Sequence, residues 1–500
     1  MSEGAKFPVE VLRDIEAQLS LPLFRGVPIG PTLGNICAIE LYEGHGKWNL
    51  AARWKDRARR VKHFLRPAAS GRDVSALPQG RILVTWMYNS SRINQLLLPT
   101  LRALGPQQCV VIGGAADVFS QVPAGAATIS WDQALHFDTA AWRADYRKCR
   151  PAWQRCIRAL CRKHALPRGA YDRLAFHILV ASRSLAGCLE FLRTVRPPVV
   201  VTEYDRNDMW SCLVLAARTL GIPTFSLVHG VINDRAVTFV PVLADKIFCW
   251  GEIQRRQLLE AGEKRAEILI GGCPRLTRDL SVTPAEARRR LGLPVDNPVI
   301  MLGTTPVRAQ DCRDMAELFC RATHAIGGVS AVVRLHAQEH LDTYSPVASR
   351  YPAVRFLMNR EATLDEALAA ADIVVVPNSG FGSDALVKGR LTIVLDLPGM
   401  RLGHGRELIE QAGCPRAANA EELAAAIKKL VTDASERARH LALAARYVTE
   451  FCAYFGQDSA QRIAAIVRES LPAGNGLPPA CKEYRPETCS PAPRRVSNGG

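Results

Sequence analysis

Residues 371–396 read as a buried strand, a polar turn, a short helix and a second strand, which is the repeating unit of a parallel α/β sheet. Ile373 to Val376 is a short apolar run, typical of a strand that is buried on both faces. A helix that begins near Gly382 would direct its first N–H groups across the carboxyl end of that strand. We therefore expect this turn to bind an anion such as a phosphate. The alternative is an ordinary βαβ turn in which Asn378 and Ser379 only cap the helix.

Length and composition limit the class of protein. A chain of 500 residues is too long for one core, and 48% hydrophobic with 22% charged residues is typical of a globular protein with two domains. No run approaches the roughly 18 uncharged apolar residues that span a bilayer, and the first residues lack the apolar core of a signal peptide. We therefore expect a cytoplasmic protein. The 15 cysteines, scattered from Cys37 to Cys489 without a CxxC pair, predict reduced thiols.

A formal net charge of +16 calls for an acidic partner or surface. Part of this charge lies in residues 53–66, where Trp54, Ala58, Val61 and Leu65 fall on one helical face among basic neighbours. That face predicts peripheral contact with an anionic membrane. The alternative is a surface helix that packs its Trp and Leu against the domain while its arginines stay in solvent. No recognised helix-turn-helix, RNA-binding or zinc-finger pattern indicates nucleic acid.

Short apolar runs alternate with helical segments along most of the chain, which predicts two Rossmann-like, doubly wound parallel sheets facing a cleft. A basic N-terminal extension is expected over residues 1–75, a first domain with a helical insertion over 76–280, and a second domain over 281–420. C-terminal helices should follow over 421–470 and a disordered tail over 471–500. Strands are predicted at 81–86, 109–113, 199–203, 224–228, 246–250 and 268–270, then at 299–303, 331–335, 354–357, 373–376 and 392–396. The long helices of the insertion are predicted at 140–164 and 169–195.

Several motifs resemble those of bacterial surface-polysaccharide glycosyltransferases with the two-domain GT-B fold. In the first domain the similar segments are Leu-Val-His-Gly at 227–230, residues 244–251, and Ile-Gly-Gly-Cys-Pro-Arg at 270–275. In the second domain Arg-Leu-His-Ala-Gln-Glu at 334–339 is similar to the His-Pro donor motif of that family. Residues 378–386 resemble its S-x-x-x-x-E-A turn. Ala337 replaces the usual proline and Asp384 the usual glutamate.

The resemblance implies a nucleotide-sugar site in the second domain. His336 follows a predicted strand and can offer a hydrogen bond or a positive charge to a phosphate, and Asp384 can accept a hydrogen bond from a ribose hydroxyl. Without a D-x-D motif or a cluster of metal ligands, we expect no metal and no cofactor besides the nucleotide-sugar substrate. The predicted donor-binding residues are Arg308, His336, Asn378, Ser379, Gly380, Gly382, Ser383 and Asp384.

Acid–base candidates follow two strands of the first domain. Glu203 and Asp205 come after one strand, and repulsion between neighbouring carboxylates could tune one as general base or leave one as a nucleophile. They point to the same side if the strand persists, whereas Asp208 is placed to cap the next helix. His229 follows the next strand and either joins the catalytic group, holds the acceptor, or closes a turn with Gly230.

The loop at residues 87–91 is the predicted acceptor side of the cleft. Asn89 and Ser90 are expected to bind an acceptor sugar, and the alternative is that the loop caps the following helix at Ser91.

These motifs predict a glycosyltransferase that moves a sugar from a nucleotide donor to an oligosaccharide or lipid-linked glycan acceptor, as in capsule or lipopolysaccharide synthesis. The resemblance allows CMP-linked acidic sugars such as Kdo or sialic acid, and UDP-sugars equally. A nonhydrolysing nucleotide-sugar epimerase, which would form product from the donor alone, is one alternative. A CDP-polyol phosphotransferase and a non-catalytic glycan-binding module are the others.

Overall fold

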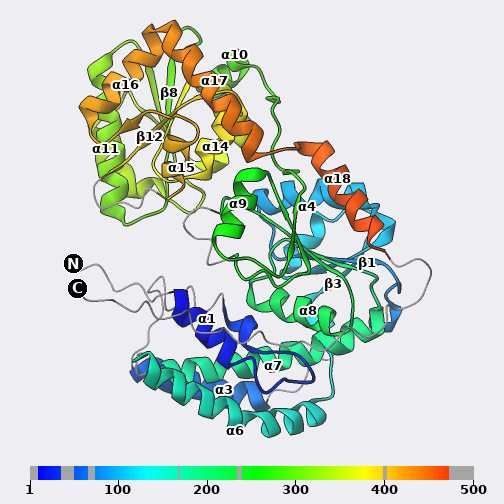
Figure 1. Cartoon of the computed structure of the whole chain (residues 1–500). Coiled ribbons are helices and arrows are strands. Elements are labelled where there is room, and N and C mark those ends of the chain that lie inside the picture. Colours follow the sequence, from blue (N-terminus) through cyan, green and yellow to red (C-terminus); the bar gives the residue numbers. More distant parts are fainter. Residues whose placement is uncertain are drawn as a thin grey trace, which may run out of the picture.

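The computed structural model describes residues 9–34, 50–65, 74–166, 169–232, 239–397 and 403–471. Two parallel sheets, each covered by helices on both faces, form the two domains (Figure 1). This arrangement confirms the predicted GT-B fold class. Of the predicted disordered tail, residues 472–500 lie outside the described part of the chain.

The first sheet has seven strands in the order β3-β2-β1-β4-β5-β6-β7, and every pair is parallel. Its central strands are fully buried runs of Val, Ile, Leu and Phe, as expected for strands covered on both faces. The strands are β1 Ile82–Trp86, β2 Cys109–Gly113, β3 Ala127–Ser130, β4 Val200–Thr202, β5 Thr224–Leu227, β6 Lys246–Cys249 and β7 Glu267–Ile270.

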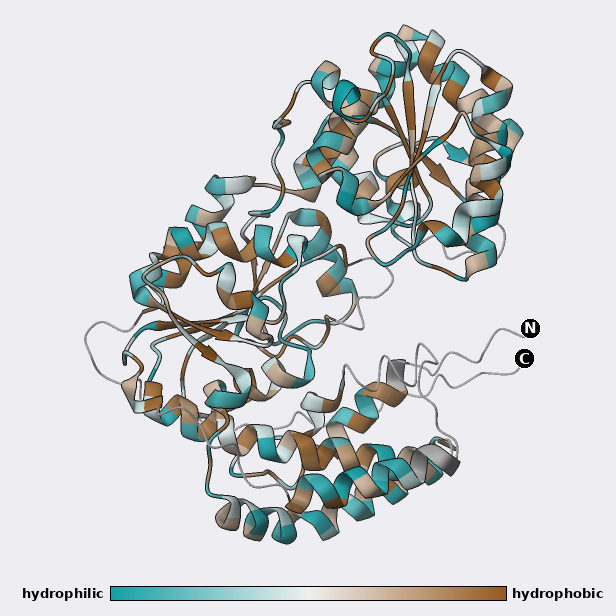
Figure 2. Ribbon diagram, turned by 180° about the vertical axis from the view of Figure 1, so that it is seen from behind, coloured by the Kyte–Doolittle hydropathy of each residue, from teal (hydrophilic) through white to brown (hydrophobic). Residues whose placement is uncertain are grey.

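Helices cover the two faces of this sheet with separate cores. One face packs against α4 Ser91–Leu104 and α18 Gly456–Glu469. The other packs against α8 Asp208–Thr219 and the long helix α7 Ala170–Val195. Figure 2 shows the strands of both sheets as hydrophobic ribbons between amphipathic helices. Shorter helices are α5 Trp131–Ala134 and α9 Glu252–Glu260.

The second sheet has six parallel strands in the order β10-β9-β8-β11-β12-β13. They are β8 Val299–Gly303, β9 Ser330–Arg334, β10 Arg355–Leu357, β11 Ile373–Val376, β12 Leu391–Leu395 and β13 Arg416–Ala417. The sequence reading missed β3 and β13, the edge strands of the two sheets, because neither is a run of apolar residues. The helices of this part are α10 Pro284–Arg290, α11 Ala309–Ile326, α12 Ser345–Arg350, α13 Leu364–Ala370, α14 Gly380–Val387, α15 His404–Glu410 and α16 Ala420–Thr432.

The C-terminal helices join the two domains. Helix α16 packs into the core of the second domain, and α17 Ala434–Phe451 lies against α14 of the second domain and α9 of the first. Helix α18 then returns to the first domain and packs on α4. The chain therefore crosses between the domains twice.

A layer of helices covers the far side of the first domain from the second (Figure 1). It consists of α1 Val9–Gln18, α3 Leu50–Leu65, α6 Thr139–Lys163 and α7, and the two long helices match the predicted insertion. Within the described residues α7 is the one helix long and apolar enough to span a membrane, and 72% of its apolar window is buried inside the protein. We therefore assign α7 to the hydrophobic core of the first domain.

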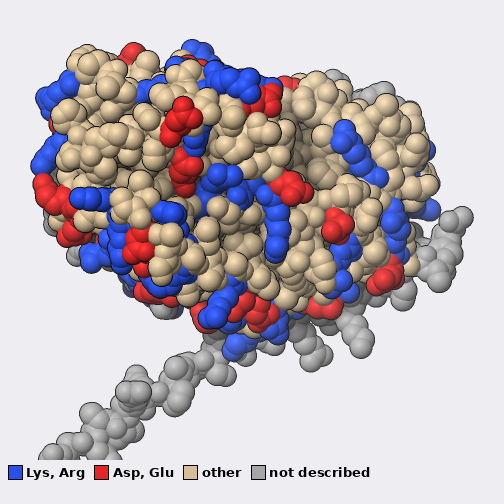
Figure 3. All heavy atoms as spheres, turned by 90° about the horizontal axis from the view of Figure 1, so that it is seen from above, with Lys and Arg blue, Asp and Glu red and all other residues tan. Residues whose placement is uncertain are grey.

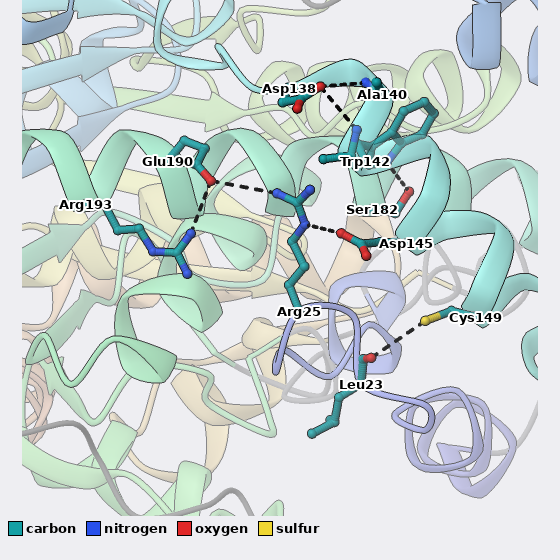
Figure 4. Close-up of polar contacts among 11 residues, drawn as sticks. Leu23, Arg25, Asp138, Ala140, Trp142, Asp145, Cys149, Ser182, Glu190 and Arg193 are labelled. Carbon is teal, nitrogen blue, oxygen red and sulfur yellow. Dashed lines mark hydrogen bonds and ion pairs between the residues drawn. The ribbon is translucent and has the colours of Figure 1, made fainter.

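Polar contacts fasten the segment after α1 to this layer (Figure 4). Arg25 Nε donates to Asp145 of α6 at 2.8 Å, and its Nη1 lies 3.8 Å from Glu190 of α7. The indole of Trp142 on α6 donates to Ser182 of α7 at 3.1 Å. Asp138 caps α6 by accepting from the N–H groups of its first turn.

Candidate functional site

The turn that enters α14 lies at the carboxyl end of β11, as predicted, and its polar groups make local contacts. Helix α14 begins at Gly380, two residues earlier than expected, and Ser379 caps it by accepting from Phe381 N at 3.2 Å. Asn378 accepts at Oδ1 from His404 N at 2.7 Å. A side chain at Gly380 would meet Val231 of the first domain at 4.0 Å, so the helix N-terminus faces the other domain across the cleft.

Two of the predicted donor residues point into the second domain instead. A Cβ at Gly382 would lie 2.6 Å from Leu408 and 2.9 Å from Val376, so only glycine lets α14 pack this closely on the sheet. Ser383 is buried, with its Oγ 2.5 Å from His404 Nε2. Direct contact of either residue with a donor stays a prediction.

Asp384 is held by an arginine from the segment that links the domains. Arg275 Nη1 lies 3.0 Å from Asp384 Oδ1, and the guanidinium stacks over Trp250 at 5.5 Å. Burial would lower the pKa of Arg275, but Asp384 outweighs it and raises that pKa. The carboxylate expected to meet a ribose is thus already in an ion pair.

Three basic groups from both domains converge on the cleft beside this pair. Arg334 ends β9, donates to Asn359 at 2.7 Å and stacks over Phe381, while its buried Nε has no partner. Arg92 begins α4 in the first domain, and a Cβ at Gly230 would lie 3.5 Å from its Nη1. No carboxylate among the described residues forms an ion pair with either arginine. Burial lowers the pKa of both guanidinium groups, and neighbouring Arg275 adds to the effect on Arg92.

His336 is the third of these groups. Its main-chain N–H donates to Thr304 Oγ1 at 2.9 Å and to Glu339 at 2.8 Å, which fixes the loop after β9. Its pKa is lowered by burial first, and the positive charges of Arg92 and Arg334 contribute although Glu339 opposes them. Because Arg92 belongs to the first domain, its effect shows that the two domains present positive charge to the same space.

His229 lies at the carboxyl end of β5, next to Arg92. The main chain of Glu203 acts on the ring and raises its pKa, and Nδ1 is buried without a hydrogen-bond partner. The ring packs edge-on against Tyr204, with centroids 4.9 Å apart. Burial, followed by the charge of Arg92, lowers the pKa of His229 to about 4. At neutral pH the imidazole is therefore uncharged, with an acceptor lone pair on one ring nitrogen.

Glu203 and Asp205 do not share a face, because β4 ends at Thr202. Glu203 is 1% exposed and accepts from Met87 N at 2.6 Å and from the Trp210 indole at 3.0 Å. Its pKa is raised by burial, against the effect of these bonds. The same-side expectation is wrong for this pair.

Asp205 braces a different loop. It is 2% exposed and accepts from Leu243 N at 2.7 Å and Ala244 N at 2.8 Å. Burial, again the largest effect, raises its pKa. Helix α8 is capped by Asn207 rather than by Asp208. A catalytic role for Glu203 or Asp205 stays a prediction, and both side chains have structural partners.

The remaining predicted residues make local bonds. Ser90, not Ser91, caps α4 by accepting from Ile93 N at 3.4 Å, and Asn89 accepts from Asn94 at 2.6 Å. Arg308 has a side chain that is 77% exposed and pairs with Asp311 on its own helix at 2.8 Å. Their roles in binding acceptor and donor stay predictions.

Sequence reasoning missed Arg92, Arg275 and Arg334 as site residues. One signal was available, because Arg92 stands in the first turn of a helix, where the helix dipole disfavours a cation. A bound anion is the simplest explanation for a basic residue in that position, because it would offset the unfavourable interaction with the helix dipole.

A cavity of about 440 Å³ lies between the domains, alongside the Arg275–Asp384 pair. This volume is within the range of small-molecule sites. In the part of the chain that the structure describes, no three His, Cys, Asp or Glu side chains gather as a metal site would require. The residues that line the cavity include Asn94, Leu98, Arg275, Asp365, Asp384 and Lys388.

The sequence matches no protein-family model. No curated protein matches it either. Among solved structures, the fold is similar to that of a protein from Listeria monocytogenes described as a UDP-N-acetylglucosamine 2-epimerase, at 15% identity and a TM-score of 0.51, covering 78% of this chain and 96% of that one.

Two further solved structures have lower scores. HepE of Anabaena, in complex with UDP and glucose, is 13% identical with a TM-score of 0.48, covering 79% of this chain and all of that one. A glycosyltransferase from Rickettsia africae is 12% identical with a TM-score of 0.48, covering 79% and 99%. At such identities the similarity to the Listeria protein shows the fold: this chain has the two-domain architecture seen in a nucleotide-sugar enzyme.

Proposed function

We propose that the protein is a glycosyltransferase that takes a sugar from a nucleotide donor carrying two negative charges. The observation that carries this proposal is the pair of guanidinium groups at the cleft, Arg92 from the first domain and Arg334 from the second. Neither forms an ion pair among the described residues, and Asp384, whose charge acts on both, is itself paired with Arg275. Arg92 is exposed and Arg334 is half-buried, so the cost here comes mainly from the mutual repulsion of positive charges gathered in one place, which a bound anion would relieve. A diphosphate, or the phosphate and carboxylate of a CMP-linked acidic sugar, would supply the missing negative charge.

His229 is the proposed general base. An acceptor hydroxyl attacks the anomeric carbon, its proton passes to the His229 imidazole, and the bond between that carbon and the donor phosphate oxygen breaks, with the nucleotide leaving as its phosphate anion. A single displacement of this kind inverts the anomeric configuration.

Donor binding should activate this base. The pKa of His229 is about 4 in the free protein partly because Arg92 lies nearby, and an anion on Arg92 would offset that positive charge. The pKa of His229 should then rise toward the neutral range, where an imidazole is an efficient base. The base would thus gain strength only when the donor is in place.

Epimerisation is the second candidate, because the Listeria structure that shares this fold is described as an epimerase. Removing a proton from a sugar carbon needs a strong base near the ring. The carboxylates placed around the cleft in the described residues are engaged elsewhere: Asp384 with Arg275, Glu203 with main chain and indole, and Glu339 with Tyr344 and the His336 N–H. This arrangement favours transfer to a hydroxyl.

The acceptor and the setting are further parts of the proposal. A glycan of a surface polysaccharide is the proposed acceptor, on the motifs at residues 227–230, 334–339 and 378–386. A cytoplasmic location is supported by the described cysteines, all of which are free thiols.

The test is a thermal-shift panel with UDP, CMP, GDP and CDP, followed by incubation of the stabilising donor with and without oligosaccharide acceptors in D₂O. Binding to the native state raises the melting temperature, so a shift with one nucleotide and none with the others identifies the donor class. Transfer predicts an acceptor-dependent product and no deuterium in the sugar ring. Product from the donor alone with deuterium on a ring carbon would establish the epimerase, and no shift with any nucleotide would refute the donor site.

A further inference from the structure

Helix α3 turns its apolar side chains outward. Trp54, Val61 and Leu65 are 65%, 60% and 63% exposed, and Ala58 between them is exposed as well. With spacings of three and four residues these side chains form one continuous row along the helix, called the apolar row below. The expectation that Trp54 and Leu65 pack against the domain is therefore wrong.

The opposite side of α3 is attached to the protein through charges. Arg57 and Arg60 both reach the fully buried Asp172 of α7, at 3.1 and 2.7 Å. Asp56 of α3 is 4% exposed and accepts from Arg173 at 3.2 Å. A surface helix ordinarily buries its apolar side and exposes its charges. Here the apolar row faces outward, and the helix is held in that orientation by ion pairs to α7 and by Phe64, which packs against Trp142 and Tyr146 of α6 with ring centroids 5.6 and 6.0 Å apart.

Helix α6 lies beside α3 and adds unpaired positive charge. Arg143 of α6 donates to the carbonyls of Phe64 and Leu65 at the end of α3, at 3.2 and 3.1 Å. Together α3 and α6 contain fourteen Lys and Arg but two Asp, so these helices carry +12 of the chain's +16. Six exposed cations of α6 form no ion pair within the described residues: Arg147, Lys148, Arg150, Arg155, Arg158 and Arg162. The face in Figure 3 is different, because acidic and basic side chains alternate over it.

We propose that the α3–α6 face docks onto an anionic lipid surface, with the apolar row entering the headgroup region and the α6 cations pairing with lipid phosphates. Tryptophan and branched apolar side chains flanked by Lys and Arg are the composition that partitions into a membrane interface. A nucleic acid or an acidic polysaccharide would use the cations, but it would leave the apolar row in water. The proposal does not depend on which reaction the cleft performs.

The test is sedimentation of the full chain with vesicles of equal parts phosphatidylglycerol and phosphatidylcholine, compared with phosphatidylcholine alone. The apolar variant is Trp54→Ser with Val61→Ser and Leu65→Ser, and its control is Leu259→Ser with Leu441→Ser, which are exposed on other helices. The charge variant is Lys148→Glu with Arg155→Glu and Arg158→Glu. Its control, with the same change in net charge, is Lys264→Glu with Lys428→Glu and Arg446→Glu.

We expect the wild type to bind the anionic vesicles and not those of phosphatidylcholine alone. Binding should weaken at least about tenfold in the apolar variant and roughly a hundredfold in the charge variant. Both controls should bind like the wild type. Circular dichroism and thermal unfolding verify that each variant is folded, as expected for exposed positions. If the apolar variant bound the vesicles as tightly as the wild type, the proposal would be overturned and a soluble polyanion would be the better ligand for this face. Displacement of the vesicles by single-stranded RNA would lead to the same conclusion. Absence of binding to anionic vesicles would overturn the proposal outright. Nucleotide-induced stabilisation should be the same in all variants, so a failed membrane result leaves the cleft assignment intact.

Discussion

Arg275 and Asp384 join the interdomain segment to the first turns of α14, with Nη1 3.0 Å from Oδ1 and both side chains buried at the edge of the cleft. The family that the sequence resembles suggests an open carboxylate here, ready for a ribose. In this protein the carboxylate is instead a fixed link between the domains. This ion pair is thus one of the contacts that set the position of α14 relative to the first domain.

Removing one partner of this pair should be costly, because it leaves the other charge buried and unpaired. We expect Asp384→Leu or Arg275→Met alone to lower the free energy of unfolding by about 3–5 kcal/mol. Arg275→Met combined with Asp384→Leu should recover most of that loss, since neither charge then remains. Urea unfolding of the two single variants and the double variant measures the coupling. Additive losses would mean that the pair is not a unit.

The unpaired arginines should determine nucleotide affinity. Losing one charged hydrogen bond to a phosphate is worth about 1.5–3 kcal/mol, so Arg92→Ala or Arg334→Ala should weaken binding of the stabilising nucleotide by roughly tenfold to a hundredfold. Calorimetric titration measures the dissociation constant. Arg102→Ala, at the exposed end of the same helix as Arg92, is the matched control. An equal affinity in Arg92→Ala and the control would place the phosphates elsewhere.

Most strand positions along the chain and the carboxyl-end position of the turn at residues 377–379 could be predicted from the sequence, because both follow from local apolar runs. His229 and His336 were found in the same way, one residue or two past the end of a strand. The ion pair of Asp384 could not be predicted, because its partner Arg275 is 109 residues away and contacts it only through the packing of two domains. The structural partners of Glu203 and Asp205 could not be predicted for a similar reason. Their partners at Met87, Leu243 and Ala244 come from loops whose paths are set by tertiary structure.

A buried polar relay connects the same turn to the first domain by another route. Tyr447 donates to Glu407 at 2.6 Å, Gln257 of the first domain donates to the same carboxylate at 2.6 Å, and His404 links it to Ser383. Burial would raise the pKa of Glu407, but these groups outweigh it and lower that pKa. The resulting stabilisation is present above the ordinary pKa of a glutamate and is lost as the pH falls below it.

Tyr447→Phe tests this relay. Losing a hydrogen bond to a buried carboxylate should reduce the free energy of unfolding by about 1.5–3 kcal/mol at pH 7, with a smaller difference from the wild type in acid. The measurement is urea unfolding at several pH values. Tyr454→Phe, at a partly exposed tyrosine, serves as control. A loss that is the same at every pH would indicate packing rather than the carboxylate.

His229 should make the protein less stable as the pH falls through the range in which an ordinary histidine becomes charged. The folded-state pKa is lowered from 6.5 to about 4, so between these values the unfolded chain takes up a proton that the native imidazole does not. The free energy of unfolding should then fall by up to about 1.4 kcal/mol per pH unit from this group, and by about 3 kcal/mol in all by pH 4. His229→Gln removes this dependence, whereas His324→Gln, at an exposed histidine, should keep it. Unfolding curves between pH 4.5 and 7.5 measure the slopes. Saturating nucleotide should weaken the dependence by raising the native pKa of His229 toward that of the unfolded chain, and parallel slopes in wild type and His229→Gln would show that the imidazole is not buried in the neutral state.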